Sequence, residues 1–199
     1  MPNDGEPTRR ETWEKRYGGA DAAPAQPARV LREFSHLLPE AGVALDLACG
    51  RGGNAVYLAR RGLDVQAWDY SENAIRGLRT AASEPGLVLE AAVRDVVREP
   101  PAVCSFDVIV VSRFLERSLA PAIVKALRPD GLLFYQTFIR DAVGQGGPRK
   151  PDFRLGTNEL LQLFASLTVL VYREEGTRGD TTEGFRDEAM LVAARPFDL

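Results

Sequence analysis

The segment VALDLACGRGGNAVYLA, residues 43–59, restricts the possible folds of this chain more than any other stretch. A short apolar run ends in a cluster of glycines, and a helical pattern begins directly after it. Glycine adopts positive φ without a steric penalty and lets backbone N–H groups approach a ligand closely. A strand, a glycine turn and a helix in this order predict the first unit of a doubly wound α/β sheet, with a ligand at the turn.

Strands and helices alternate along the rest of the chain. We expect strands at 43–47, 64–68, 87–93, 106–112, 132–138, 167–174 and 187–195. Helices are expected at 53–61, from a cap at Ser71 to near Gly86, at 119–127, and at 158–166 with Thr157 as cap. Repeated strand–helix–strand units require parallel strands with helices on both faces. No clear helix joins the last two strands, which favours a hairpin with one antiparallel strand. The predicted fold class is therefore α/β: a Rossmann-like, doubly wound, seven-stranded sheet in three layers, α/β/α, mostly parallel with a C-terminal antiparallel hairpin.

The N-terminal part of the chain predicts a lid. Residues 8–17 and 28–38 have helical patterns, and the segment GGADAAPAQP between them acts as a hinge through Gly18, Gly19 and Pro24. Trp13 and Tyr17 lie on one helix face and could exclude water from a cofactor. We expect residues 1–39 to form N-terminal lid helices and residues 40–199 to form the main domain.

Composition excludes several classes of function. The formal net charge of −3 gives no basic surface for nucleic acid. No apolar run reaches the roughly 20 residues of a membrane span, and the N-terminus lacks the apolar segment of a secretory signal. Cys49, Cys104 and the single histidine, His36, form no metal-binding pattern. We therefore expect no metal, no membrane contact, reduced thiols and a cytoplasmic monomer or homodimer.

The glycine turn has two interpretations. Residues 50–55, GRGGNA, match the dinucleotide fingerprint G-x-G-x-x-[G/A]. Against a dinucleotide, Asp46 would repel a pyrophosphate and suits an amino-bearing ligand. The expected C-terminal hairpin also leaves no second mononucleotide half. Asp69 ends the second strand, where an acid can accept hydrogen bonds from both ribose hydroxyls.

The segment DLACGRGGN resembles motif I of the class I S-adenosylmethionine-dependent methyltransferases. Asp69, Asp95, FDVIVVS and LRPDGLLFYQTF follow in the order typical of that family. The segment CGRGGNAVYLARRGLDVQAWDYSENAI, with WEKRYGG before it, is similar to the tellurite-resistance (TehB-like) methyltransferases, although many of those carry Arg where Gly53 stands. The resemblance implies S-adenosylmethionine as cofactor and a small-molecule methyl acceptor.

The resemblance also implies roles for individual residues. Asp46 would pair with the methionine amino group, and Asp69 would hold the ribose hydroxyls. Tyr70, Asp95 and Val96 would contact the adenine. The expected cofactor-binding residues are Asp46, Ala48, Gly50, Gly52, Asn54, Asp69, Tyr70, Asp95, Val96 and Ser112. Gly53 either contacts the cofactor or serves close packing of helix and strand.

The acceptor is less determined by the sequence. No histidine lies near a strand end, so no general base is assigned, which favours a soft or already anionic acceptor such as a thiol or a selenium or tellurium oxyanion. The expected acceptor-side residues are Tyr17, Arg113, Arg140 and Arg149. Two alternatives stay open: an NAD(P)-binding Rossmann oxidoreductase and a non-catalytic S-adenosylmethionine-binding protein. A nucleic-acid methyltransferase is disfavoured, because SRFL follows the fourth strand instead of an Asn/Asp-Pro-Pro-aromatic motif.

Overall fold

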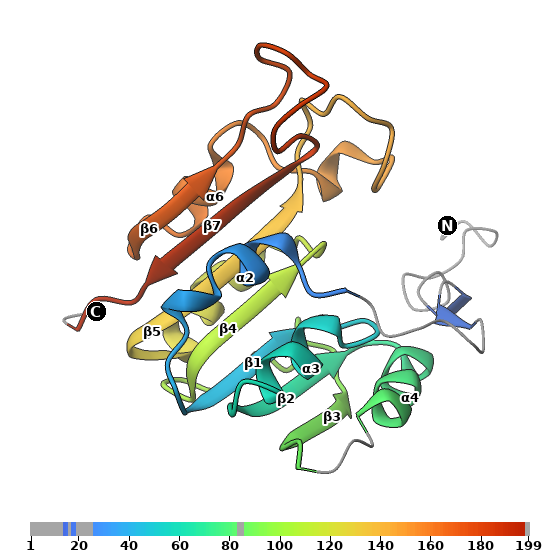
Figure 1. Ribbon diagram of the computed structural model, residues 1–199, viewed down its shortest axis with the longest axis vertical. Helices are drawn as coiled ribbons and strands as arrows, with labels where there is room; N and C mark the ends of the chain where they lie inside the picture. Colours follow the sequence, from blue (N-terminus) through green and yellow to red (C-terminus); the bar gives the residue numbers. More distant parts are fainter. Residues whose placement is uncertain (1–13, 16, 19–25, 83–85, 198–199) are drawn as a thin grey trace, which may run out of the picture.

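A seven-stranded sheet forms the centre of the molecule, with strand order β3-β2-β1-β4-β5-β7-β6 (Figure 1). The computed structural model describes residues 14–15, 17–18, 26–82 and 86–197. The strands are β1 (Val43–Leu47), β2 (Asp64–Asp69), β3 (Leu89–Val93), β4 (Phe106–Ser112), β5 (Leu127–Phe138), β6 (Thr168–Arg173) and β7 (Glu188–Ala194). All pairs from β3 to β5 are parallel, and β7 is antiparallel to both β5 and β6. The predicted fold class is confirmed.

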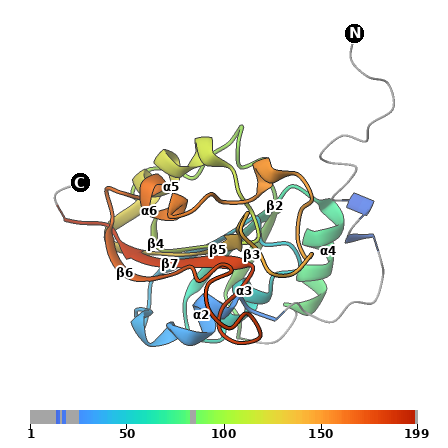
Figure 2. The ribbon, with the colours of Figure 1, turned by 90° about the horizontal axis from the view of Figure 1, so that it is seen from above.

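The sheet lies between two helical layers, as Figure 2 shows from above. The α-helices are α2 (Arg29–Glu33), α3 (Gly53–Ala59), α4 (Glu72–Ala81), α5 (Ala120–Ala126) and α6 (Glu159–Leu163). Short 3₁₀ helices are η1 (Ser35–Leu37), η2 (Arg117–Leu119) and η3 (Pro151–Phe153). Helices α5 and α6 cover one face, while α2 and α3 cover the other.

The middle of the central strand β4, residues 108–111, is a continuous apolar run. Val108 and Val110 belong to the core cluster shared with α2, α3 and α4, whereas Ile109 and Val111 belong to the cluster shared with α5 and α6. Because both faces are covered here, each of these four side chains packs into a core, and the alternation seen in half-exposed strands is absent from this run.

The predicted helix bounds agree only in part with the structure. Ser71 caps α4 as predicted, accepting a hydrogen bond from Ala74 N. Thr157 is not the cap of α6: the N-cap is Asn158, at φ 59°, and no side chain caps the helix. The Thr157 hydroxyl donates to Asp141 Oδ2 (3.4 Å) instead, and Glu159 reaches back to Gly156 N (2.6 Å). The helix predicted at 28–38 divides into α2 and η1 at Phe34, where φ is −111°.

Helix α2 is built into the core. Val30 and Leu31 are fully buried, and Val30 N donates to Gln136 Oε1 (2.8 Å). Ala28 N donates to Asn54 Oδ1 (2.8 Å). These contacts fix residues 28–33 on the sheet, so a lid within the predicted range 1–39 would have to consist of residues before α2. Of that part, Trp13, Gly19, Pro24 and most of the helix predicted at 8–17 lie outside the described residues.

The glycine turn can be tested with two matched alanine variants. Gly52 has φ +74°, and an added Cβ would lie 2.8 Å from Leu78 Cδ2. Gly77 lies within α4, where an added Cβ would meet nothing within 4 Å. We expect Gly52→Ala to lower the free energy of unfolding by about 1–3 kcal/mol, because it combines overpacking with a disfavoured backbone conformation. Gly77→Ala should raise it by roughly 0.5–1 kcal/mol. Denaturant unfolding measures both, and a fully stable Gly52→Ala protein would contradict this packing.

Candidate active site

A cleft of about 1490 Å³ lies at the carboxyl ends of the parallel strands. It is lined by residues that follow β1 (Ala48, Gly50), β2 (Tyr70), β3 (Asp95) and β4 (Arg113). In doubly wound sheets this edge is where ligands bind, because the loops there diverge and leave a crevice. The predicted position of the ligand site therefore coincides with a real cleft.

The turn after β1 is fixed to the end of β2. Gly50 N donates to Asp69 Oδ2 (2.8 Å), and Cys49 N donates to Trp68 O (2.9 Å). Ala48, Gly50 and Gly52 all have positive φ, between 53° and 74°. An added Cβ on Gly50 would lie 2.7 Å from the Tyr17 hydroxyl oxygen. Glycine at position 50 thus permits both the turn and the approach of Tyr17.

Asp69 presents a carboxylate to the cleft from the end of β2. Its Oδ1 accepts from Ser71 N (2.9 Å), and the residue is only 7% exposed. Burial raises the pKa of Asp69, and the hydrogen bonds from Ser71, Gly50 and Tyr70 N–H groups partly oppose that rise. Since a carboxylate has about four acceptor positions and three backbone N–H groups already donate to Asp69, one position remains for a ligand hydroxyl.

Asp46 lies beneath the cleft and does not line it. Its oxygens accept from Asn54 Nδ2 (3.2 Å) and from Ala55 N (3.0 Å). Burial raises its pKa from 3.8 to about 7. Asp46 therefore holds the start of α3, and Asn54 is the residue of this pair that lines the cleft.

The structure places Gly52 and Gly53 differently relative to the cleft. Gly52 packs against Leu78 and does not line the cleft, whereas Gly53 does. The sequence pattern alone could not show this, because the contact that requires glycine at 52 comes from α4.

The predicted adenine-side residues come together at the β2–β3 end of the cleft. Tyr70, Asp95 and Val96 all line it. Asp95 Oδ1 accepts from Val97 N (3.1 Å), which fixes the loop after β3. The Arg94 guanidinium carbon lies 3.9 Å from the centre of the Trp68 ring beside them.

Part of the N-terminal segment contacts this end of the cleft. Glu14 accepts hydrogen bonds from Ser71 Oγ (2.9 Å), Glu72 N (2.7 Å) and Asn73 N (3.2 Å), at the N-terminus of α4. Tyr17 lines the cleft. The lid role of this segment stays a prediction, and Glu14 is the contact that would hold it closed.

Gln136 and Glu188 are site residues that the sequence analysis missed. Glu188 is 7% exposed; it accepts from Gln136 Nε2 and from Arg113 Nε (3.1 Å). Both line the cleft, next to Ser112, whose Oγ accepts from Asn54 Nδ2 (2.9 Å). A polar residue inside an apolar strand, as in LLFYQTF, is the signal that could have identified Gln136.

The predicted basic residues of the acceptor side require correction. Arg113 lines the cleft, but Arg140 and Arg149 are exposed and do not. Arg154 binds Pro148 O (2.8 Å) and Ile139 O (2.9 Å), which folds the loop back on itself. In the resulting loop, Lys150 lines the cleft in place of its neighbour Arg149.

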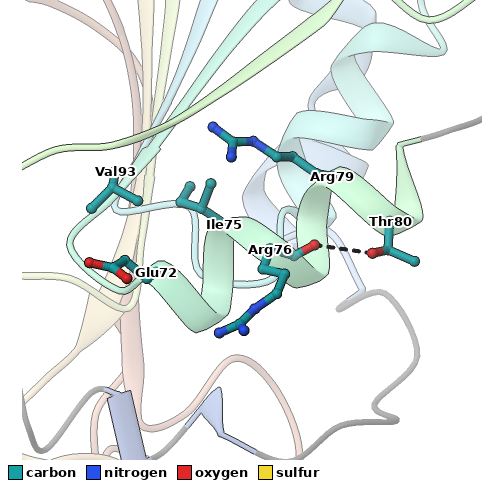
Figure 3. A pocket seen from close by; sticks show the side chains of 6 residues that line it. All are labelled: Glu72, Ile75, Arg76, Arg79, Thr80 and Val93. Atoms are coloured by element: carbon teal, nitrogen blue, oxygen red, sulfur yellow. Dashed lines mark hydrogen bonds between the residues drawn. The ribbon is translucent and has the colours of Figure 1, made fainter.

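A second, shallower depression lies apart from this cleft. It measures about 490 Å³ and is lined by six residues of α4, its vicinity and β3: Glu72, Ile75, Arg76, Arg79, Thr80 and Val93. Figure 3 shows these side chains along one side of α4, with Thr80 Oγ1 donating to Arg76 O (3.2 Å). None of the predicted site residues belongs to it.

Other site types were also considered. Within the described ranges, no group of three His, Cys, Asp or Glu side chains is placed to hold a metal ion. None of the helices described here has the length and apolar character needed to cross a membrane.

Comparison with known proteins assigns the fold to a family. Residues 44–131, which contain the turn and the first four strands, match the family described as "Methyltransferase domain". These residues are therefore similar to a methyltransferase domain. "Probable S-adenosyl-L-methionine-dependent methyltransferase TehB" of Haemophilus influenzae is 30% identical over 140 residues, covering 65% of this chain and 47% of that protein. "Ubiquinone biosynthesis O-methyltransferase" of Xylella fastidiosa is 36% identical over 116 residues, covering 54% and 46%. The chain thus spans about half the length of these curated relatives.

Solved structures agree with the methyltransferase domain. TehB of Haemophilus influenzae superposes with a TM-score of 0.67 at 22% identity, covering 92% of this chain and 65% of TehB. An S-adenosylmethionine-dependent methyltransferase of Mesorhizobium loti gives 0.66 at 19% identity, covering 84% and 98%. At these identities the likeness shows the fold, and the predicted class I methyltransferase fold is confirmed.

The buried Asp46 gives the methyltransferase domain a predictable pH dependence. Between pH 3.8 and about 7 the folded protein binds more protons at Asp46 than the unfolded chain does. The free energy of unfolding should therefore fall as pH rises through this interval, by up to about 4 kcal/mol from this group. Asp46→Asn should reduce the slope, measured by denaturant unfolding at several pH values. Asp64→Asn removes an exposed carboxylate at the far end of β2 and should keep the wild-type slope. An Asp46→Asn slope equal to that of the wild type would be inconsistent with a buried, titrating Asp46.

Proposed function

We propose that this protein binds S-adenosylmethionine and transfers its methyl group to a small-molecule acceptor. The observation that carries the proposal is Asp69, a buried carboxylate held by Gly50 N and Ser71 N at the wall of the cleft. The methyltransferase domain over residues 44–131 supports it.

The residues present fit this cofactor. Burial is the main cause of the raised pKa of Asp46, and the negative charge of Asp69 adds to it. A ligand that brings an ammonium and a sulfonium group would relieve this repulsion, whereas a pyrophosphate would increase it. The chemistry of the turn therefore favours S-adenosylmethionine over a dinucleotide.

The roles of individual residues follow from their places in the cleft. Asp69 would accept a ribose hydroxyl, while Tyr70, Asp95 and Val96 would surround the adenine. Ala48 and Asn54 would face the methionine end, and Ser112 would lie near the reacting centre. When bound, S-adenosylmethionine supplies an electrophilic methyl group. The chain itself has to align the acceptor and exclude water.

The acceptor that we propose is soft or anionic, such as a thiol or a selenium or tellurium oxyanion. The basic side chains that line the cleft support an anion. For a protic acceptor, Glu188 is a buried carboxylate in the cleft that could take up the proton, and Arg113 and Gln136 fix its orientation. We further propose a cytoplasmic protein, consistent with the free thiols of Cys49 and Cys104.

The test is the affinity for S-adenosylmethionine, measured by titration calorimetry. Asp69→Asn should weaken binding about tenfold to a hundredfold, because a hydrogen bond from a ribose hydroxyl to a charged group is impaired. Asp64→Asn, at the other end of the same strand, is the matched control and should bind like the wild type. Unchanged affinity in folded Asp69→Asn protein would contradict the ribose assignment.

Binding and activity measurements on the wild-type protein distinguish the methyltransferase from the two alternative functions. Thermal stabilisation by NAD or NADP, and none by S-adenosylmethionine, would indicate the oxidoreductase. Binding of S-adenosylmethionine without methyl transfer to thiols, selenite or tellurite would favour a non-catalytic binding protein.

A further inference from the structure

The cleft extends beyond the part that the proposed cofactor would fill. The adenosine-side residues lie at the ends of β1, β2 and β3, and β4 marks the expected site of methyl transfer. Past β4 the lining continues on β5, on β7 and on α2, which lies over β5 in Figure 1. We call this part the acceptor chamber. Its lining includes Arg32, Phe138, Lys150, Phe153, Asp187 and Glu188.

The acceptor chamber carries an excess of positive charge. Five basic side chains line it: Arg29, Arg32, Arg113, Lys150 and Arg186. The acids that line it already accept hydrogen bonds from other groups of the protein. Asp187 Oδ1 accepts from Val143 N (2.7 Å) and Gly144 N (2.8 Å), and Glu188 accepts from Arg113 and Gln136. Because the whole chain has a net charge of −3, this excess is a local property of the chamber.

Two of these cations are available for a ligand. Arg29 pairs with Glu33, Arg113 pairs with Glu188, and Arg186 lies 3.8 Å from Glu175. Arg32 and Lys150 have no ion pair within the described residues, and both are exposed while lining the cleft. They come from separate elements, α2 and the loop that leads into η3.

Aromatic side chains line the same chamber. Phe153 is 41% exposed, although it is large and apolar. Phe138 is held in place by Gly147, where an added Cβ would lie 2.5 Å from its Cδ1, and by the Arg154 guanidinium, 5.8 Å from the ring centre. Partly exposed rings inside a cleft provide apolar surface for a planar ligand.

We infer that the methyl acceptor is a small aromatic molecule that carries an anionic group. Arg32 and Lys150 bind the anion, and Phe138 and Phe153 contact the ring. This inference rests on the proposed function, because it assigns the acceptor of the same cleft. It narrows the proposed acceptor from any soft or anionic molecule to an aryl anion. It also assigns the binding of the anion to Arg32 and Lys150 in place of Arg140 and Arg149.

Binding of benzoate to the protein saturated with S-adenosylhomocysteine tests the inference. Benzamide is the neutral control for the charge, and acetate is the control for the ring. We expect benzoate to bind at millimolar concentration and more tightly than either. Arg32→Gln and Lys150→Gln should each weaken benzoate binding about threefold, and the double variant about tenfold, as expected for partly exposed ion pairs. Benzamide binding should not respond to any of these changes.

Arg149→Gln is the matched control variant, because it removes the same charge from the adjacent position outside the cleft. It should bind benzoate like the wild type. Higher salt should weaken benzoate binding to the wild type more than to the double variant. All substituted residues are exposed, and thermal unfolding checks that each variant is folded.

Several results would overturn the inference. Equal binding of benzoate and benzamide, or an equal loss in Arg149→Gln and Lys150→Gln, would exclude an anion site at these residues. Acetate binding as tightly as benzoate would show that the aromatic ring does not contribute to binding, and would exclude an aromatic acceptor. If S-adenosylhomocysteine does not bind, the proposed function fails, and the same titrations on the free protein still decide whether the anion site exists.

Discussion

The hydrogen bond from Gly50 N to Asp69 Oδ2 joins the ends of two neighbouring parallel strands. It fixes the turn after β1 at positive φ and keeps a carboxylate at the wall of the cleft. Below the turn, Asp46 binds Ala55 N and so sets the first turn of α3. The shape of the cleft and the position of the helix thus depend on two acids that accept backbone N–H groups.

Ionisation of these two acids has an electrostatic cost. Burial raises the pKa of both Asp46 and Asp69, which means that ionising them destabilises the fold. Strain and buried charge of this kind are typical of functional sites, where a ligand compensates for them. A cationic cofactor at the turn and an anionic acceptor near Arg32 and Lys150 would match the two charged regions of one cleft. The cleft therefore has acids at its cofactor end and cations at its acceptor end, and each end is opposite in charge to the substrate proposed for it.

Much of the fold could be predicted from the sequence. The strands at 43–47 and 106–112 agree with the structure at both ends, because a short, mostly apolar segment between turn residues is a local signal. The turn, Asp69 and the antiparallel last strand were also predictable. Thr157 as a cap was wrong, because its hydroxyl donates to Asp141, which is 16 residues away in the sequence, and Glu159 accepts from Gly156 N instead.

The residues of the acceptor side were less predictable, because their positions depend on contacts made in the folded protein. Whether Arg149 or Lys150 lines the cleft depends on how Arg154 folds the loop. A shift of the loop by one residue would change which of the two side chains lies there. Gly52 and Gly53 differ through a contact with Leu78 that is distant in the sequence. Gln136 and Glu188 come together across β5 and β7, so their pairing requires the strand order.

The most direct test of the account is a crystal structure of this protein with S-adenosylhomocysteine. The account predicts a ribose hydroxyl within hydrogen-bond distance of the Asp69 carboxylate, with the homocysteine beside Asn54 and the adenine near Asp95. A ligand bound elsewhere, or one bound in this cleft with no contact between its ribose and Asp69, would contradict it.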